Sequence, residues 1–255
     1  MAVALVTGAA RRIGHHIALM LAEEGYDLAL CIRPDRSDQG GEALRRDIEH
    51  KGTRVTILPA DLSNASAVEK LIPDAAAALG PVSLLINNAS LFDADTAATM
   101  TQTTWDEHMN VNLRAPAFLA RALHAQLPRN GGNTGNIINL IDQRVWRPNP
   151  LFFSYTLSKM GLWDMTRVMA QAFAPDIRVN AIGPGPTLQS VHQTAEDFAH
   201  EIASMPLQRG TTPQEICAAI RFILSSPAMT GQMIALDGGQ HLAWATPDVV
   251  GKKYE

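Results

Sequence analysis

Short apolar runs alternate with longer helical runs along nearly the whole chain, and this alternation constrains the fold most. The apolar runs are continuous, as in the first of them, Val3–Val6. Continuously apolar strands are typical of a parallel sheet buried on both faces, with helices as crossovers. The predicted strands are Val3–Val6, Leu28–Ile32, Arg54–Leu58, Ser83–Ile86, Asn136–Leu140, Arg178–Ala181 and Met233–Leu236. The predicted helices are Ile13–Glu24, Gly40–Lys51, Ala65–Leu79, Thr103–Gln126, Tyr155–Phe173 and Pro213–Ser225.

These elements follow one another without a break that would mark a domain boundary. A chain of 255 residues could hold one domain or two small ones, but it has no linker rich in Pro, Gly or Ser and no internal repeat of solenoid length. We therefore predict a single doubly wound α/β domain over residues 1–255. Ligands of such a fold bind outside the carboxyl ends of the strands, so the loops that follow the strands should carry the chemistry.

Composition and charge exclude several kinds of protein. The net charge is −4 and 18% of the residues are charged, which is typical neither of a disordered segment nor of a basic nucleic-acid binder. Cys31 and Cys217 lack the spacing of a disulfide framework or a metal site, and we expect two reduced, buried thiols. No apolar run reaches the ~18 residues of a membrane span, and the N-terminus shows no leader pattern. We expect a soluble cytoplasmic protein without metal, nucleic-acid or membrane partners.

A turn of small residues, Thr7–Gly14, directly follows the first strand and opens the first helix. Gly8 permits a tight turn, and the alanines that follow it allow a pyrophosphate to approach the backbone. Gly14 allows the helix to pack closely on the strand, and the start of the helix supplies free N–H groups. This turn therefore predicts a dinucleotide site.

The end of the second strand bears on which dinucleotide binds. An acidic residue there would accept hydrogen bonds from the ribose hydroxyls of NAD, but the strand ends in Ile32 and Arg33. Arg12 and Arg36 lie nearby, and guanidinium groups match a 2′-phosphate in charge and geometry. We therefore predict NADP(H), although Asp35 keeps NAD open. The alternative is that Arg33 and Arg36 are solvated loop charges.

Polar residues follow two further strands. Asp61 and Leu62 come after the third strand, where the Asp could accept a hydrogen bond from the adenine amine. Asn87-Asn88-Ala89-Ser90 follows the fourth strand, where Asn87 could hold the turn and small Ala89 leaves room for a cofactor. Asn and Asp are common in turns, so each residue is weak evidence alone. Their shared position at strand carboxyl ends is what favours a cofactor site.

Tyr155, Lys159 and Asp142 form the candidate catalytic group. Tyr155 and Lys159 are four residues apart and share a helix face, so the ammonium should lower a phenol pKa that is ordinarily ~10. Asp142 lies thirteen residues before the Tyr. An ionised Asp cannot donate to a ketone oxygen, so it is either protonated through burial or faces donors on the substrate. Alternatively, it is a structural cap or salt-bridge residue near Arg144.

Two features near this group admit both a functional and a structural interpretation. Phe92 offers a flat surface for stacking a substrate, or it is a core or lid aromatic. Gly183–Ser204 is the least regular part of the chain, and it is either a surface excursion or a lid over the substrate. We predict a substrate loop or lid at about residues 183–212.

Taken in order, these motifs resemble the short-chain dehydrogenase/reductase family. The resemblance rests on Thr7–Gly14, Asn87-Asn88-Ala89, Asn112, Tyr155 with Lys159, and Gly183-Pro184-Gly185, and it covers nearly the whole chain. It implies a Rossmann-type sheet of seven parallel strands and a homotetramer. It also implies that Tyr155 is the proton donor, that Lys159 lowers its pKa and binds the nicotinamide ribose, and that Asn112 helps to hold a proton-relay water.

Two departures from the commonest family pattern narrow the resemblance. Arg12 replaces the middle Gly of the turn, and Asp142 replaces the catalytic Ser. Both departures, with Ser90 and Phe92, resemble the pteridine reductase branch and the similar dihydromonapterin reductases. In that branch the Phe stacks the pterin against the nicotinamide, the Arg and Ser contact cofactor phosphate or substrate, and the Asp acts with the Tyr in proton delivery.

The resulting predictions are specific to residues. The catalytic residues are Tyr155, Lys159, Asp142 and Asn112. The NADP(H) site consists of Gly8, Arg11, Arg12, Ile13, Gly14, Arg33, Asp61, Leu62, Asn88, Ala89, Ser90, Tyr155, Lys159, Pro184 and Gly185. The substrate site consists of Phe92, Ser90, Asp142 and Tyr155.

Three functions remain open from the sequence. The leading one is an NADP(H)-dependent reductase of a dihydropteridine or related nitrogen heterocycle, with proton delivery by Tyr155 and Asp142. The second is a carbonyl reductase or alcohol dehydrogenase of the same family, acting on a 3-oxoacyl or other ketone substrate with a protonated Asp142. The third is a non-catalytic NADP(H) sensor, since fold does not imply function.

Overall fold

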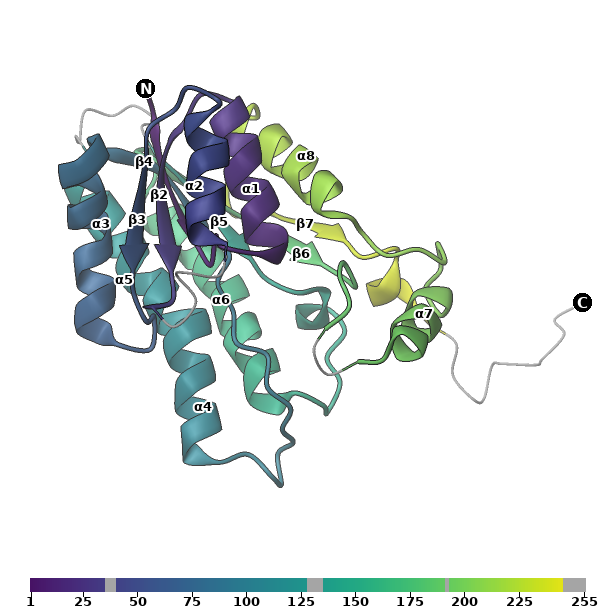
Figure 1. Cartoon of the computed structure of the whole chain (residues 1–255). Helices are drawn as coiled ribbons and strands as arrows, with labels where there is room; N and C mark the ends of the chain where they lie inside the picture. The colour runs from purple at the N-terminus through teal and green to yellow at the C-terminus, as the bar shows by residue number, and fades with distance from the viewer. Residues whose placement is uncertain (35–39, 128–134, 191–192, 245–255) are drawn as a thin grey trace, which may run out of the picture.

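A single sheet of seven parallel strands runs through the molecule (Figure 1). The computed structural model describes residues 1–34, 40–127, 135–190 and 193–244. The strands lie in the order β3-β2-β1-β4-β5-β6-β7. They are β1 Val3–Thr7, β2 Asp27–Ile32, β3 Val55–Pro59, β4 Val82–Asn87, β5 Gly135–Leu140, β6 Ile177–Pro184 and β7 Met233–Leu236. The predicted α/β fold is confirmed, and each predicted strand is present.

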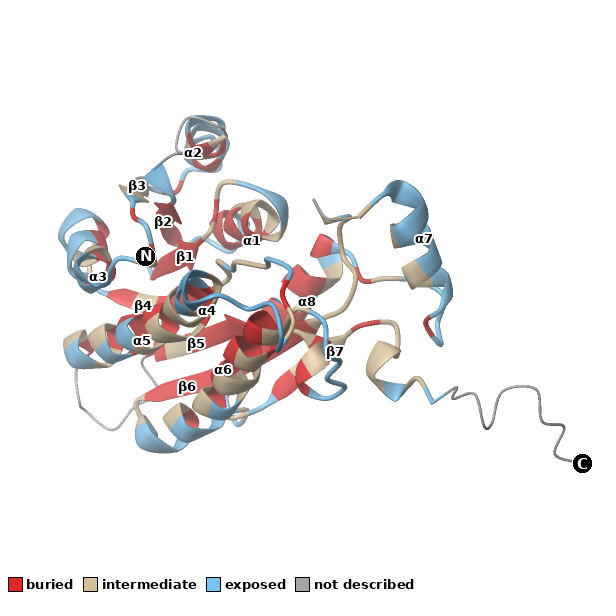
Figure 2. Cartoon of the chain, turned by 90° about the horizontal axis from the view of Figure 1, so that it is seen from below, coloured by how far each residue is buried: buried red, intermediate tan, exposed pale blue. Residues whose placement is uncertain are grey.

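Helices cover both faces of this sheet. The α-helices of the described residues are α1 Arg12–Glu23, α2 Gly41–Glu49, α3 Ala65–Leu79, α4 Gln102–Met109, α5 Ala115–Gln126, α6 Phe153–Ala172, α7 Ala195–Ala203 and α8 Pro213–Leu224. α1, α2 and α8 pack on one face, and α3, α5 and α6 on the other (Figures 1 and 2). The two layers explain why the strands are apolar throughout.

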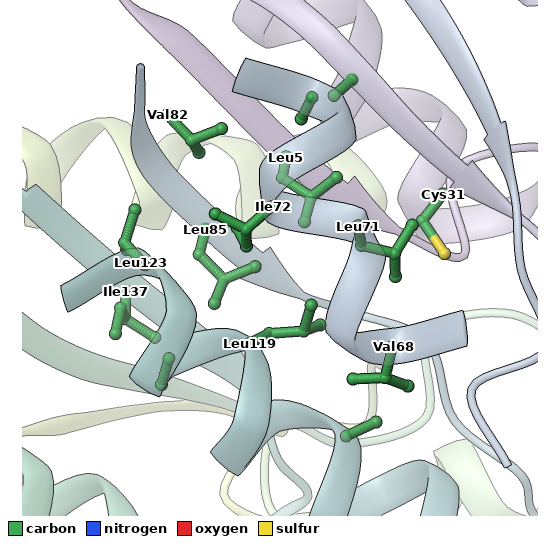
Figure 3. Close-up of a cluster of buried hydrophobic side chains, with 14 of the residues drawn as sticks. Leu5, Cys31, Val68, Leu71, Ile72, Val82, Leu85, Leu119, Leu123 and Ile137 are labelled. Atoms are coloured by element: carbon green, nitrogen blue, oxygen red, sulfur yellow. The ribbon is translucent and has the colours of Figure 1, made fainter. Parts of the chain in front are cut away.

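Successive strand residues supply two separate cores. Along β1, Val3 and Leu5 face the α3 and α5 side, whereas Ala4 and Val6 face the α1 and α8 side. Figure 3 shows the first of these cores, in which side chains of α3 and α5 meet Leu5. Leu5 has no exposed surface, so Leu→Ala there would cost about 2–5 kcal/mol. The two cores hold the sheet rigid at the strand ends that carry the site.

The predicted helix Thr103–Gln126 is interrupted. A π-helical turn, Asn110–Arg114, lies between α4 and α5. One widened turn leaves the hydrophobic period on both sides almost unchanged, which is why the sequence predicts a single helix. Such turns occur frequently at functional sites, and this one contains Asn112, which is fully buried.

The predicted lid segment contains a helix, α7, that the sequence analysis did not predict. A capping box at Thr194 and Asp197 starts this helix, and the pattern Thr-x-x-Asp before helix-forming residues could have revealed it. The two ends of this segment are joined by a hydrogen bond, because the Thr211 N–H donates to the Pro186 carbonyl at 3.1 Å. Whether the excursion moves over a substrate stays a prediction.

Three further observations concern the described part of the chain. None of its helices has both the length and the apolar character needed to span a membrane. It contains no cluster of three or more His, Cys, Asp or Glu side chains that could bind a metal ion. Cys31 and Cys217 are both free thiols in the interior.

Candidate active site

Two strand ends meet at the centre of the sheet, where the strand order changes direction. β2 and β3 extend from β1 to one side, whereas β5, β6 and β7 extend from β4 to the other. In doubly wound sheets, ligands bind outside the carboxyl ends of the strands at this switch point. The turn after β1 and the residues after β4 therefore form the centre of the candidate site.

Hydrogen bonds clamp these two strand ends together. Thr7 Oγ1 accepts from the backbone N–H groups of Asn88 and Ala89, each at 3.0 Å. Asn88 Nδ2 donates to the carbonyl oxygens of Thr7 at 2.9 Å and Gly8 at 3.2 Å. Asn88 therefore fixes the shape of the turn that should cradle a phosphate.

The sequence-based assignment of this clamp to Asn87 is wrong. Asn87 is buried as the last residue of β4, and its Nδ2 donates to Asn139 Oδ1 on neighbouring β5 at 2.8 Å. Asn139 in turn donates to Thr166 Oγ1 at 2.9 Å. Successive strand residues point in opposite directions, so locating a strand end one residue early exchanges the roles of two adjacent asparagines.

The turn after β1 leaves the start of α1 open to a ligand. Gly8 has φ +65°, and a Cβ at Gly14 would lie 2.2 Å from the Gly8 carbonyl oxygen, so both positions require glycine. Among the described residues, no N-cap side chain bonds the start of α1 or of α2, whereas Asn64, Thr101, Thr194 and Thr212 cap α3, α4, α7 and α8. Uncapped N–H groups at a helix start bind phosphate, so the turn fits the pyrophosphate of a dinucleotide.

We expect Gly14→Ala to abolish dinucleotide binding. The new methyl group would force α1 away from the Gly8 carbonyl and from Asn88, whose Nδ2 would be 2.6 Å from it. The matched control is Gly41→Ala, where a Cβ would meet the flexible side-chain ends of Ile32 at 3.0 Å and Ile57 at 3.7 Å. Fluorescence titration with NADPH measures both variants, and wild-type affinity in Gly14→Ala would contradict this account of the turn.

Arg12 joins the phosphate turn to the excursion after β6. Its φ of +54° is in the left-handed region that favours glycine, which agrees with its position in place of the middle Gly of the turn. Its guanidinium donates to the carbonyl oxygens of Leu188 at 3.0 Å and Gln189 at 2.9 Å. Arg12 therefore contacts the predicted lid as well as lining the turn.

The other predicted cofactor residues lie at strand carboxyl ends. Asp61 Oδ1 accepts from the N–H and the hydroxyl of Ser63, both at 2.8 Å. Gly185 packs against the residue that follows β7, since a Cβ would lie 2.8 Å from Asp237 Cα. Arg11 and Arg33 are exposed, whereas Asp35 and Arg36 lie outside the described residues. The remaining predicted positions at these ends and in the turn are Ile13, Leu62, Ser90 and Pro184.

Tyr155, Lys159 and Asp142 come together as the sequence predicts. Tyr155 and Lys159 lie on one face of α6, and both are buried. The Tyr155 hydroxyl donates to Asp142 Oδ2 at 2.7 Å, and Lys159 Nζ donates to the Leu140 carbonyl at 2.8 Å. The ammonium nitrogen lies 5.8 Å from the centroid of the Tyr155 ring. α6 and the end of β5 thus bring a phenol, a carboxyl and an ammonium into one small volume.

The expected lowering of the Tyr155 pKa is not found. Burial raises this pKa well above its ordinary value, and the charge and hydrogen bond of Asp142 raise it further. Burial also raises the pKa of Asp142 and lowers the pKa of Lys159 to about 8. The prediction considered Lys159 alone, whereas desolvation and the adjacent carboxylate both disfavour a phenolate.

Asp142 is the structural cap that the sequence offered as one alternative, and its functional role stays a prediction. Its Oδ1 accepts from the Arg144 backbone N–H at 2.8 Å and caps the short 3₁₀ helix Gln143–Val145. Its Oδ2 accepts from the Tyr155 hydroxyl. The cap fixes the orientation of the carboxyl group, so Oδ2 is held toward the Tyr155 hydroxyl.

An aromatic wall stands beside Tyr155. The Phe92 ring lies edge to face with Tyr155, with centroids 4.6 Å apart, and stacks on Phe152 at 4.1 Å. The Arg144 guanidinium lies 5.1 Å from the Phe152 centroid and 5.8 Å from the Phe92 centroid. Phe152 was not predicted, although it lies only three residues before Tyr155, and Arg144 was considered only as a partner of Asp142.

Asn112 engages its whole amide group within the protein. Its Oδ1 accepts from the Leu91 N–H at 2.9 Å, and its Nδ2 donates to the Leu91 carbonyl and to Ser158 Oγ, both at 3.0 Å. Both amide protons are therefore used to hold the segment before Phe92 against α6. The predicted role in holding a relay water stays a prediction.

Comparison with known proteins identifies the family. The family described as Enoyl-(Acyl carrier protein) reductase matches residues 8–241. A 3-oxoacyl-[acyl-carrier-protein] reductase from Staphylococcus epidermidis is 30% identical over 94% of this chain and 98% of its own length. The chain belongs to the short-chain dehydrogenase/reductase family. It is therefore an oxidoreductase.

Two solved structures are more similar to this short-chain dehydrogenase/reductase than that relative is. FolM alternative dihydrofolate reductase 1 from Brucella suis, in complex with NADP, is 46% identical with a TM-score of 0.92. The protein of the same name from Brucella canis, also complexed with NADP, is 45% identical with a TM-score of 0.90. In both cases the similarity covers 98% of each chain.

Proposed function

We propose that this short-chain dehydrogenase/reductase is an NADP(H)-dependent reductase of a dihydropteridine or a related nitrogen heterocycle. The observation that carries the proposal is the hydrogen bond of 2.7 Å between Tyr155 and Asp142, beside the aromatic wall of Phe92 and Phe152. The two Brucella neighbours, which are named as alternative dihydrofolate reductases, support the same substrate class.

The carboxyl group makes a nitrogen heterocycle a better substrate than a ketone. An ionised Asp142 would repel the oxyanion that a reduced ketone becomes, and it has no proton to donate. A dihydropterin instead offers N–H donors that a carboxylate can accept, and a flat ring that an aromatic side chain can stack. The raised pKa of Asp142 also allows this carboxyl to bind and release a proton closer to neutral pH.

The cofactor site follows from the turn after β1. The uncapped start of α1, with glycines at positions 8 and 14, would hold the pyrophosphate, and Arg33 after β2 would attract a 2′-phosphate. Bound NADPH would supply the hydride that adds to the carbon of the C=N bond. Tyr155 would donate its hydroxyl proton toward the ring nitrogen. The ionised Asp142, whose pKa is raised by burial, would then take up a proton from solvent and pass it to the Tyr155 phenolate across their hydrogen bond.

A second candidate is a carbonyl reductase that acts on a 3-oxoacyl or other ketone substrate. The Staphylococcus relative with that name favours it. Steady-state assays with NADPH across dihydropterins, 3-oxoacyl thioesters and simple ketones separate the two candidates. Turnover of ketones without turnover of any dihydropterin would reject the leading proposal.

Loss of the positive charge of Lys159 should lower activity at high pH. Its pKa is lowered to about 8 by burial, so the ammonium is charged below that pH and neutral above it. We therefore expect kcat/KM for NADPH, which reports the free enzyme, to fall as the pH rises through about 8. Lys159→Arg is the control, because a guanidinium stays charged and the decline should move to higher pH.

Arg144 should favour substrates that carry a negative charge beyond the ring. Its guanidinium borders the aromatic wall, and its Nη1 donates only to the neutral oxygens of Asn149 and Leu151. Among the described residues, no carboxylate lies within salt-bridge distance of it. We expect Arg144→Gln to raise KM about tenfold for dihydrofolate, whose tail carries carboxylates, and little for the uncharged dihydrobiopterin. Equal changes for both substrates would contradict this role.

The assembly and location of the enzyme belong to the same proposal. We propose a cytoplasmic homotetramer, as the family resemblance implies, with the excursion at residues 183–212 acting as a lid. Val168 on α6 and Phe118 on α5 are apolar side chains with 62% and 37% exposure, which is consistent with a partner on that face. Light scattering of the purified protein measures the assembly, and a monomeric mass would contradict it.

A further inference from the structure

Side chains from one helical segment hold the backbone on both sides of Phe92. Asn112 binds both the N–H and the carbonyl of Leu91, at 2.9 and 3.0 Å. His108 Nε2 accepts from the N–H of Asp93 at 3.1 Å. His108 and Asn112 are four residues apart and therefore lie on the same side of α4 and the π-helical turn. The segment that carries Phe92 thus has two points of attachment.

The same two side chains also bind α6. Asn112 Nδ2 donates to Ser158 Oγ at 3.0 Å, and His108 Nδ1 lies 2.7 Å from Ser154 Oγ. Ser154 and Ser158 are again four residues apart, so the two pairs form parallel rungs between the helices. Ser158 Oγ donates to the Tyr155 carbonyl at 2.6 Å. We call these two pairs, together with Asp95, the polar ladder.

The geometry assigns every proton on the rung formed by His108. A backbone N–H can only donate, so Nε2 of His108 is the acceptor and Nδ1 carries the proton. Nδ1–H therefore donates to Ser154 Oγ, and the Ser154 hydroxyl donates to Asp95 Oδ2. Burial lowers the pKa of His108, which keeps the ring neutral as this arrangement requires.

Asp95 also replaces the missing cap of α6. The first residue before this helix, Phe152, has φ +54° and no capping side chain. Asp95 Oδ1 accepts from the Ser154 N–H at 3.1 Å, and its carbonyl accepts from the Phe153 N–H at 3.3 Å. Asp95, His108, Asn112, Ser154 and Ser158 are all buried. The segment after β4 and the start of α6 are therefore one hydrogen-bonded unit.

We propose that the polar ladder is a positioning device that sets the Phe92 ring against Tyr155, and that His108, Ser154 and Asp95 are positioning residues of the substrate site. The proposal rests on the proposed function in taking Phe92 as a wall of that site and Tyr155 as its proton donor. Fully satisfied buried networks specify a single arrangement of the groups they hold. Here the groups held are the aromatic surface and the proton donor, whose relative position decides whether a stacked ring meets the Tyr155 hydroxyl.

The test compares two buried hydroxyls of α6. Ser154→Ala removes the bridging hydroxyl of the ladder. Thr166→Val is the matched control, since Thr166 Oγ1 also bridges two groups, the Leu162 carbonyl and Asn139, but far along the helix from Phe92. We expect Ser154→Ala to raise KM for the dihydropterin about tenfold, equivalent to one buried hydrogen bond, with the NADPH Kd unchanged. Thr166→Val should lower the stability of the fold by a similar amount. It should leave both the KM for the dihydropterin and the Kd for NADPH unchanged.

A double-mutant cycle shows whether the ladder acts through Phe92. In a Phe92→Ala background, Ser154→Ala should raise KM no further. Full addition of the two effects, or an effect of Ser154→Ala no larger than that of Thr166→Val, would overturn the proposal. Asp95→Asn, which keeps the size of the side chain, serves as the second variant if Ser154→Ala does not fold, and it should change KM in the same direction.

A measurement without substrate separates this proposal from the proposed function. The chain has 3 tyrosines, so fluorotyrosine labelling gives few ¹⁹F resonances, and Tyr155→Phe assigns the one of interest. Ser154→Ala should shift or broaden the Tyr155 resonance because the Phe92 ring moves, whereas Thr166→Val should leave it unchanged. No turnover of any dihydropterin by the wild type would reject the proposed function alone. An unchanged Tyr155 resonance in Ser154→Ala would reject the ladder.

Discussion

Tyr155→Phe should lower kcat by about 10²–10⁴-fold, the range that removal of a positioned proton donor usually costs. The phenol hydroxyl donates to Asp142, and the variant deletes only this oxygen from a buried ring. NADPH binding should persist, because the phosphate turn, Lys159 and the fold are unchanged. Single-turnover measurement of the chemical step, with NADPH affinity determined separately, distinguishes lost chemistry from lost binding.

The control for this result is Tyr26→Phe, which deletes the hydroxyl of a half-buried tyrosine away from the site. Its kcat should equal that of the wild type. A Tyr155→Phe enzyme that retains more than about a tenth of the wild-type kcat would show that another group delivers the proton.

Asp142→Asn should lower kcat for a dihydropterin by about 10²-fold or more while it raises the melting temperature at neutral pH. The amide oxygen keeps the cap on the Arg144 N–H. The amide NH2 then takes the place of Oδ2, where it can donate to the Tyr155 oxygen but can neither accept from the hydroxyl nor pass on an acid proton. Lower activity together with higher stability in Asp142→Asn would show that the wild-type carboxyl serves catalysis at a cost to the stability of the fold.

The sign of the stability change follows from the raised pKa of Asp142. In the unfolded chain the carboxyl has its ordinary pKa of 3.8, and in the folded protein the pKa is higher. Folding therefore disfavours the charged form, so the wild type loses stability as the pH rises above 3.8 through the folded pKa. The stabilisation of Asp142→Asn should be largest at neutral pH and vanish as the pH falls below 3.8. A stability difference between Asp142→Asn and the wild type that grows toward acid pH would contradict the raised pKa of Asp142.

Asp142→Ser tests substrate class at the same position. A hydroxyl can donate to a ketone oxygen, so this variant should lose dihydropterin turnover and, if the site otherwise admits ketones, reduce them better than the wild type. Unchanged dihydropterin turnover would count against an acid–base role for Asp142.

Much of the fold could be predicted because local pattern and global fold agree here. Continuous apolar strands such as β2, with helices between them, allow few arrangements other than a doubly wound parallel sheet. The turn at Gly8 and Gly14 could also be predicted as a dinucleotide-binding turn, because only glycine fits at these two positions. The positions of Tyr155, Lys159 and Asp142 followed from spacing along α6 and from the end of β5.

The features that escaped prediction depend on contacts between distant segments. The π-helical turn at Asn112 leaves little trace in the hydrophobic period, and Phe152 joins Phe92 only because α6 and the segment after β4 pack together. The pKa of Tyr155 depended on burial and on Asp142, and a sequence gives no measure of either effect at a particular atom. Sequence spacing therefore identified the groups but not their protonation.

Transfer of deuterium from NADPH labelled at C4 of the nicotinamide tests the central claim most directly. Wild-type enzyme and a dihydropterin should give a tetrahydropterin with one deuterium on the former C=N carbon, detected by mass spectrometry of a single turnover. Tyr155→Phe should give almost none in the same time. Deuterium found only in the alcohol from a competing 3-oxoacyl thioester, with none in the pterin, would contradict the account.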